Sequence, residues 1–339
     1  MRRLAASLLL VAALTACSGS SSSSGAGSSG GSTATTATAD EASRIGLAGH
    51  ILFTRTSGND LQTIFTADAN GQQERQLTEP GQYCCPRVAP RHDKILVMSG
   101  ADPQPTPVTG GTVNLDGSGF KRLRLTDPKL NLVPQAWSPD GRRIAFEGWE
   151  DGNPARTGVY TARASDGGDL VRVTRPGGLP HDIPLDYSPD GKRLVFYRAV
   201  AAEPDFPIDL GGSLWVVNAD GSGPRRIKTG ANPPAWWARW SPDGRRIVFA
   251  TQRTAPQGAL WTADVDSLAV TKLFEDKEGR FPIQPTWSPD AQHVMFALDP
   301  TNDAFTHPAN GLFVIKADGT GLTLISGTDD FKSQPEWWQ

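Results

Sequence analysis

The side chains best suited to catalysis or metal binding in this sequence are five histidines and three cysteines. The histidines are His50, His92, His181, His293 and His307. None of their spacings matches a set of metal ligands. His181 precedes Asp182, and this pair has the chemistry to hold a base or a metal ligand, but neighbouring residues of a strand point to opposite faces. We therefore predict no catalytic residue, no metal and no cofactor.

Two of the cysteines, Cys84 and Cys85, are neighbours in the chain. In an oxidising compartment such a pair either closes a strained vicinal disulfide or remains as two buried thiols, and the sequence leaves both interpretations open. No C-x-x-C spacing accompanies the pair, which argues against a zinc site.

The third cysteine, Cys17, follows a segment typical of an export signal. Two arginines give the segment a positive start, residues 4–14 are apolar apart from one serine, and small residues follow. As a helix, these residues would rise only about 16 Å, too little for a hydrocarbon core of about 30 Å. The sequence Leu14-Thr15-Ala16-Cys17 resembles the lipobox of bacterial lipoproteins, in which the cysteine receives a diacylglyceryl group. This resemblance implies that residues 1–16 are a cleaved signal peptide and that Cys17 is lipidated.

Residues 17–45 are expected to form the lipidated cysteine and a flexible tether. Positions 18–39 contain only Ser, Gly, Ala and Thr, a composition that cannot bury enough apolar surface to fold. Such a tether has an end-to-end distance of about 25 Å. The folded part, residues 46–339, would lie outside the cytoplasm, anchored to the cell membrane or, in a two-membrane envelope, to the outer membrane.

Composition and charge narrow the class of protein. The 36 Gly, 27 Pro and 10 Trp residues favour many short strands joined by turns. The net charge is -3, and loss of the two arginines of the signal peptide leaves 31 basic against 36 acidic side chains, or -5. Because nucleic-acid binding needs a basic surface that neutralises phosphates, we predict no nucleic-acid partner.

An internal repeat determines the fold. Its unit is an aromatic residue, the turn Ser-Pro-Asp-Gly, two polar residues and an apolar triplet. The clear copies are Trp137–Phe146, Tyr187–Phe196, Trp240–Phe249 and Trp287–Phe296, with a degenerate copy at Val88–Val97. Each copy predicts a β-hairpin, and two further strands around an Asp-Gly turn follow it, so that every unit has four strands. The second unit has glycines at 110 and 111, and we expect it to be irregular.

The two ends of the chain complete one another. The segment Gln334-Pro335-Glu336-Trp337 matches Gln284-Pro285-Thr286-Trp287 but has no hairpin after it, whereas Ile51-Leu52-Phe53 matches a triplet without a strand before it. Pairing the last strand with the first three closes a ring without an open edge. The sequence therefore predicts an all-β fold, a six-bladed β-propeller with four-stranded antiparallel blades. The repeat resembles the WD40-like PD40 repeat of TolB-type propellers, and this resemblance covers residues 48–339.

The loops opposite the two sets of turns vary in length, and variable loops on a rigid scaffold are where recognition usually occurs. Their aromatic and charged residues suit a protein, peptide or glycan partner. The candidate binding residues in and beside these loops are Tyr83, Asn131, Trp149, His181, Asp182, Phe206, Trp236, Trp237, Arg280, Phe281, Phe331 and Lys332. Trp236 and Trp237 are the strongest candidates, although one of the two could instead pack between blades.

Resemblance to TolB-like propellers implies an interaction platform in an envelope complex. We therefore expect a monomeric, non-catalytic module that binds an envelope protein, peptide or glycan. The alternative is a propeller enzyme, such as a metal-dependent lyase or hydrolase with its site at the central channel, because related propellers include lyases and the lid domains of serine peptidases. The only Gly-x-Ser-x-Gly sequence, at Gly27–Gly31, lies in the tether. A purely structural role is the third possibility, and the sequence does not separate it from binding.

Overall fold

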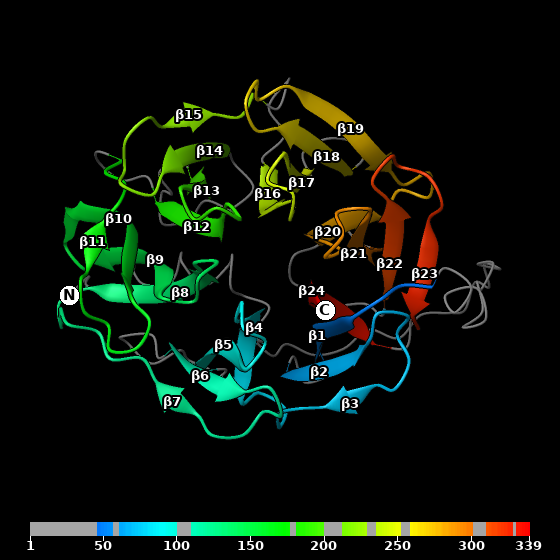
Figure 1. The fold of residues 1–339 in the computed structure, drawn as a ribbon, viewed down its shortest axis with the longest axis horizontal. Coiled ribbons are helices and arrows are strands. Elements are labelled where there is room, and N and C mark those ends of the chain that lie inside the picture. The colour runs from blue at the N-terminus through cyan, green and yellow to red at the C-terminus, as the bar shows by residue number, and fades with distance from the viewer. Residues whose placement is uncertain are drawn as a thin grey trace, which may run out of the picture.

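In a computed structural model, the described residues are 46–56, 61–99, 110–176, 181–199, 212–228, 235–251, 258–300, 310–327 and 330–339. Every regular element in these ranges is a β-strand, and the strands form six four-stranded sheets arranged in a ring (Figure 1). The ring confirms the predicted six-bladed propeller. The described ranges contain no helix that is long and apolar enough to cross a bilayer.

Each sheet is one blade, and the innermost strand of each blade lies closest to the ring axis. Blade 1 has the order β24-β1-β2-β3, and blades 2 to 6 take the remaining strands four at a time, in chain order from β4 to β23. The strands are β1 (His50–Thr56), β2 (Gln62–Asp68), β3 (Arg75–Gln76), β4 (Tyr83–Val88), β5 (Lys94–Ser99), β6 (Gly110–Asn114), β7 (Lys121–Arg122), β8 (Asn131–Trp137), β9 (Arg143–Glu150), β10 (Asn153–Arg163), β11 (Val171–Arg172), β12 (Asp182–Tyr187), β13 (Arg193–Ala199), β14 (Gly212–Asn218), β15 (Arg225–Arg226), β16 (Ala235–Trp240), β17 (Arg246–Thr251), β18 (Ala259–Asp264), β19 (Val270–Glu275), β20 (Phe281–Trp287), β21 (His293–Asp299), β22 (Gly311–Lys316), β23 (Thr323–Ser326) and β24 (Phe331–Trp338).

Blade 1 closes the ring by pairing the two ends of the chain, as the sequence predicted. β24 runs antiparallel to β1, with His50 opposite Trp338 and Thr56 opposite Phe331. The hydroxyls of Thr54 and Ser333 lie 2.7 Å apart inside this pair. Since the last strand supplies the innermost position of blade 1, no blade of the ring is left with a missing strand.

The repeated Ser-Pro-Asp-Gly turn is held by its own serine, as blade 3 shows. Ser138 Oγ donates to Asp140 Oδ1 at 2.6 Å and accepts from the backbone N–H of Arg143 at 2.9 Å. Gly141 adopts a φ of 68°, a conformation that favours glycine. The same serine bonds recur in blades 4, 5 and 6. These side chains therefore define turn geometry, in agreement with the expected structural role.

The Asp-Gly turns dock each blade onto the one before it. Gly167, in the turn between β10 and β11, has a φ of +72°, and a Cβ there would lie 1.5 Å from the backbone oxygen of Arg124 in the preceding blade. Four other glycines meet a carbonyl of the preceding blade in the same way: Gly71, Gly117, Gly221 and Gly319. A side chain at these positions would push neighbouring blades apart.

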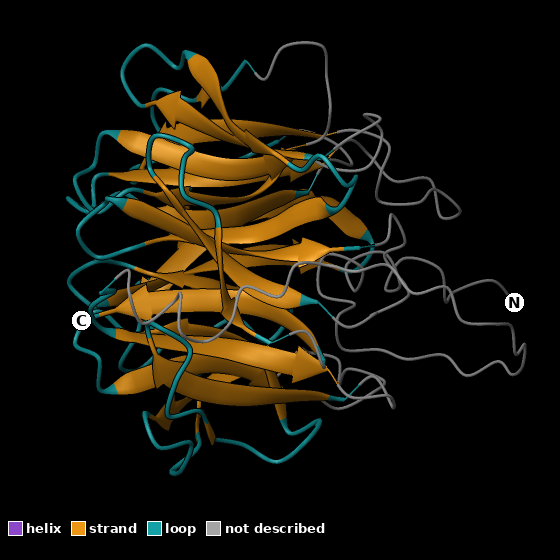
Figure 2. Ribbon diagram, turned by 90° about the vertical axis from the view of Figure 1, so that its right-hand side faces the viewer, coloured by secondary structure: helices purple, strands orange, loops and turns teal. Residues whose placement is uncertain are grey.

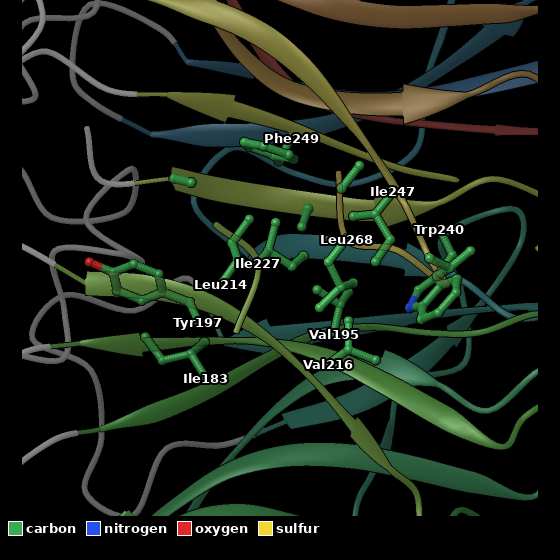
Figure 3. Packing of buried hydrophobic residues seen from close by; sticks show 14 residues of the cluster. Ile183, Val195, Tyr197, Leu214, Val216, Ile227, Trp240, Ile247, Phe249 and Leu268 are labelled. Atoms are coloured by element: carbon green, nitrogen blue, oxygen red, sulfur yellow. The ribbon is translucent and has the colours of Figure 1, made fainter. Parts of the chain in front are cut away.

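Apolar side chains fill the wedges between blades, and Figure 3 shows the wedge between blades 4 and 5. Val195 and Leu214 of blade 4 pack there with Phe249 and Trp240 of blade 5, and all four are buried. Blade 2 has its full four strands, so the expected irregularity does not affect strand pairing. It affects side chains instead.

The antiparallel order gives the ring two different ends. The Ser-Pro-Asp-Gly turns and the Asp-Gly turns lie together at one end, which we call the turn face, on the left of Figure 2. The innermost strands begin at the other end, which we call the loop face. Each innermost strand thus runs from the loop face to the turn face along the axis.

Candidate functional site at the propeller axis

All six innermost strands are irregular at about the same height along the axis. In each blade, the register against the second strand shifts by one residue, which is the signature of a β-bulge. The residues at the bulges are Cys85, Gln135, Leu185, Trp237, Gln284 and Gln334. Bulges aim side chains and backbone groups away from a regular ladder and commonly occur next to binding sites.

Four of the bulges contain a residue in the left-handed region. The φ angles are 58° at Cys85, 52° at Trp237, 51° at Gln284 and 54° at Gln334, and none of these residues is glycine. Holding such a residue with φ above zero costs on the order of 1–3 kcal/mol, and strain of this kind concentrates at functional sites. The same strained conformation recurs at equivalent positions around the axis, which indicates that the bulges are a shared element of the repeat and belong to the architecture of the channel.

The bulge residues line an axial cavity of about 50 Å³, room for a few water molecules. Three glutamine amides, the sulfur of Cys85 and the indole of Trp237 face this space. Gln334 is 9% exposed, and its Oε1 atom is buried without a hydrogen-bond partner among the described residues. Its backbone N–H donates to Gln284 Oε1 at 2.7 Å. The channel therefore offers an unused acceptor beside other amide groups.

Charged side chains occupy the axis on the turn-face side of the bulges. Glu336 Oε1 accepts from Arg239 Nη2 at 2.7 Å and lies 3.3 Å from Arg87 Nη1. Asp186 accepts the backbone N–H of Trp240 at 2.9 Å. Burial, together with the neighbouring charge of Arg239, lowers the pKa of Arg87 to about 10, against the opposing effect of Glu336. Burial also raises the pKa of Asp186 to about 6, against the opposing effect of Arg239.

A second polar cluster joins blades 3 and 4 near the loop face. The carboxylate of Glu147, on β9, is 1% exposed and lies 3.2 Å from Nδ1 of His181. The ring of His181 meets Trp149 edge-on at a centroid distance of 6.3 Å. Burial raises the pKa of Glu147. Burial alone would lower the pKa of His181, but the hydrogen bond to Glu147 and the negative charges of Glu147 and Asp182 together outweigh burial, and the pKa of His181 is raised.

The structure places most of the predicted binding residues in strands rather than in loops. Six of them are buried at the loop-face ends of the innermost strands: Tyr83, Asn131, Asp182, Phe281, Phe331 and Lys332. Four others are partly exposed: Trp149, His181, Trp237 and Arg280. Of the six buried residues, Tyr83 and Phe331 pack in buried apolar clusters between blades.

Several of these side chains have structural partners. Asp182 forms a two-pronged ion pair with Arg198, at 2.7 and 2.8 Å. Arg280 does the same with Asp276, at 3.1 and 2.8 Å. Lys332 Nζ donates to a backbone oxygen at 2.6 Å. These contacts stabilise the connections between strands.

Trp237 packs against three of the buried clusters and also lines the axial cavity. Trp237 therefore packs between blades, as the sequence left open for one member of the tryptophan pair, and its role in binding stays a prediction. Phe206, Cys17 and the side chain of Trp236 lie outside the described residues. The sulfur atoms of Cys84 and Cys85 are buried and lie 3.0 Å apart.

The described ranges contain no group of three or more His, Cys, Asp or Glu side chains that would hold a metal ion. Sequence reasoning missed the channel residues Gln135, Arg87 and Arg239, and it missed Glu147 of the cluster between blades 3 and 4. A signal was present for the six bulge residues, because each stands two to four positions before the last residue of its innermost strand. The convergence of these positions on one axis requires the closed ring.

Six four-stranded blades, closed by pairing of the chain ends around a bulged axial channel, define the class of six-bladed β-propellers. The family model for the TolB β-propeller domain, PD40, matches residues 121–339. This chain belongs to that family. The match confirms the resemblance seen in the repeat.

Among curated proteins, the Tol-Pal system protein TolB of Anaeromyxobacter dehalogenans is 33% identical over 117 residues, which cover 34% of this chain and 23% of that protein. The chain thus matches less than a quarter of that relative's length. Among solved structures, TolB from Acinetobacter baumannii aligns with a TM-score of 0.65 at 18% identity, covering 85% of this chain and 66% of the other. An oligogalacturonate lyase in complex with manganese aligns with a TM-score of 0.56 at 16% identity, covering 79% and 74%. Both structures show likeness of fold.

Proposed function

We propose that this protein is a non-catalytic binding module of the cell envelope that holds a peptide segment of a partner protein at its axial channel. The observation that carries the proposal is the ring of bulges, which brings three glutamine amides and an unpartnered carbonyl oxygen, Oε1 of Gln334, to one space. Amide donors and acceptors match the backbone groups of a bound peptide. Membership of the TolB propeller family supports the same class of function.

The cavity of about 50 Å³ is too small for a drug-sized ligand, which needs about 300 Å³ or more. It fits the tip of one side chain, or a chain end, inserted along the axis. Trp237 and Leu185 supply apolar contact beside the amides. The loop face would then contact the rest of the partner, with Trp149 and His181 partly exposed there.

The test compares how much partner protein is captured by the wild-type propeller and by a variant whose axial channel is blocked. Gln135 lines the channel, and Gln135→Arg should fill the space and reduce recovery of the partner in a quantitative pull-down from envelope extracts. Gln72→Arg, on the exposed side of the turn after β2, is the matched control. Equal recovery with Gln135→Arg and wild type would reject the axial site.

We further propose that Cys17 is lipidated after removal of residues 1–16 and that residues 17–45 tether the propeller to a membrane outside the cytoplasm. Two acyl chains suffice for stable anchoring, at about 0.8 kcal/mol per buried methylene. Metabolic labelling with a palmitate analogue should mark the wild type and leave Cys17→Ala unlabelled and in the soluble fraction. Labelling of Cys17→Ala would contradict this proposal.

The alternative is a metal-dependent propeller enzyme, and the likeness in fold to a manganese-bound lyase is the observation that favours it. Elemental analysis of purified protein distinguishes the two functions. Stoichiometric manganese that is lost on substitution of channel residues would favour the enzyme over the binding module.

A further inference from the structure

A groove with a volume of about 920 Å³ separates blades 2 and 3 at the turn face. One wall is the turn after β4 together with β7 and the two residues that follow β7, and the other wall is formed by the two turns of blade 3. Pro90, Leu123 and Trp137 give the groove apolar surface. Its volume lies at the upper end of the range of about 300–1,000 Å³ for ligand pockets.

The lining of this groove is strongly basic in a protein whose net charge is -3. Eight of the lining residues are Arg or Lys and four are Asp, a local excess of four positive charges. Three of the four aspartates are already engaged: Asp140 accepts from the serine of its own turn, and Asp166 and Asp169 both pair with Arg163. The aspartates of the groove therefore do not neutralise its excess of arginine and lysine charge.

Five cations of the groove form neither an ion pair nor a side-chain hydrogen bond with any described residue: Arg91, Lys94, Lys121, Arg122 and Arg124. Four of the five are exposed, and Lys94 is half-buried. Mutual repulsion of so many unpaired cations raises the energy of the unliganded surface, and an anionic partner relieves it.

The wedge between blades 2 and 3 lacks a cation–π contact that is present in two other wedges of the ring. Arg193 of blade 4 stacks over Trp240 of blade 5, 4.9 Å from the ring centroid, and Arg246 of blade 5 stacks over Trp287 of blade 6 at 4.7 Å. The equivalent position in blade 2 is Lys94, and no cation–π contact joins it to Trp137. Trp137 is partly exposed and lines the groove between the basic walls.

We propose that the groove between blades 2 and 3 binds an acidic peptide segment of a partner protein. Carboxylates of the segment would pair with the five uncompensated cations, and an apolar side chain would pack on Trp137. A concave groove between two rigid blades admits an extended chain, whereas a flat lipid surface reaches only its rim. This site is separate from the axial channel, and its partner chemistry differs from that of the amide-lined cavity.

The sequence offers a closely matched control. Lys121-Arg122-Leu123-Arg124 spans β7 of blade 2, and Arg225-Arg226-Ile227-Lys228 spans β15 of blade 4. Both carry three cations around one apolar residue on an outermost strand, and all six cations are exposed. Only the first set lines the groove.

The experiment measures binding of a fluorescent peptide rich in Asp and Glu with one Phe, by polarisation at about 0.15 M salt. Lys121→Glu, Arg122→Glu and Arg124→Glu combined should weaken binding by about tenfold or more. The matched triple variant, Arg225→Glu, Arg226→Glu and Lys228→Glu, should bind within about twofold of wild type. Thermal unfolding of both variants checks that the ring is intact.

A second arm uses vesicles of anionic phosphatidylglycerol in place of the peptide. Equal loss in the two triple variants, or no binding of the peptide to wild type, would overturn the proposal. Vesicle binding that depends on the groove triple, without peptide binding, would also overturn it in favour of a membrane contact. The proposal for the axial channel is tested with a different variant, Gln135→Arg. A negative result for the groove therefore leaves the test of the axial channel unaffected.

Discussion

Replacing Glu336 by Gln should destabilise the propeller strongly, because this carboxylate is the shared partner of two arginines on the axis. Its Oε1 atom lies 2.7 Å from Arg239 and 3.3 Å from Arg87, and the three side chains are 17%, 14% and 19% exposed. Breaking a fully buried pair costs about 3–5 kcal/mol. Partial solvation reduces this figure, and we expect Glu336→Gln to lower the free energy of unfolding by about 2–4 kcal/mol.

The control is an ion pair with the same N–O distance and a different environment. Lys272 and Glu275 on β19 are 2.7 Å apart but 46% and 35% exposed. Glu275→Gln should therefore cost no more than about 1 kcal/mol. Urea unfolding followed by circular dichroism measures both variants under the same conditions.

A double-mutant cycle separates charge from packing. If the cost of Glu336→Gln arises from uncompensated arginine charge, then adding Arg87→Met should recover part of it, because one buried cation is removed. A cost for Glu336→Gln below that of Glu275→Gln, or no recovery in the double variant, would show that water screens the axial charges. The reasoning about the channel would then be wrong.

The remaining predictions concern the same folded state. Folding raises the pKa of Glu147 above its ordinary value of 4.5 and the pKa of His181 above its ordinary value of 6.5, so the folded protein binds more protons than the unfolded chain. The free energy of unfolding should therefore fall as pH rises through the raised pKa values. Glu147→Gln should make the free energy of unfolding less dependent on pH across that range. Phe331→Ala, in the closing strand β24, should lower the free energy of unfolding in urea by about 3–5 kcal/mol. The control Phe120→Ala, at a site 41% exposed, should lower it by about 1 kcal/mol. Equal losses in the two variants would contradict closure of the ring by β24. Ser241→Ala removes the buried hydroxyl that holds its turn, and calorimetry should show a loss of about 1–2 kcal/mol.

The fold was predictable because its determinants are local and repeated. The turn serine, the aspartate two residues later and the apolar triplet recur at regular spacing, so each hairpin follows from adjacent residues. Closure was predictable from Glu336 and Trp337, whose segment had no hairpin of its own. The burial and hydrogen bonding of residues within one blade can thus be predicted from the pattern of residue types in the sequence.

The axial site was less predictable because it combines one residue from each blade. Gln135 of blade 3 and Gln334 of blade 1 lie two blades apart, and nothing near either one in the chain indicates that both line one cavity. Glu147 appears as an ordinary strand residue, and only the packing of blade 3 on blade 4 buries it against His181. The charges of the groove were hidden in a different way, since the net charge of the whole chain is negative while the local charge is positive.

The pairing of β1 with β24 also determines at which end of the ring the described part of the chain enters the propeller. The Nε1 atom of Trp337 donates to the backbone oxygen of Ala48 at 3.0 Å, so the segment that enters the propeller lies at the turn face, beside the carboxyl end of the chain. If Cys17 is lipidated, as we propose, the anchor would join the propeller at the turn face, and the loop face would be free to point away from the membrane. A partner bound at the loop face and a partner bound in the basic groove would then occupy opposite ends of the ring, so one propeller would have room for two proteins at once.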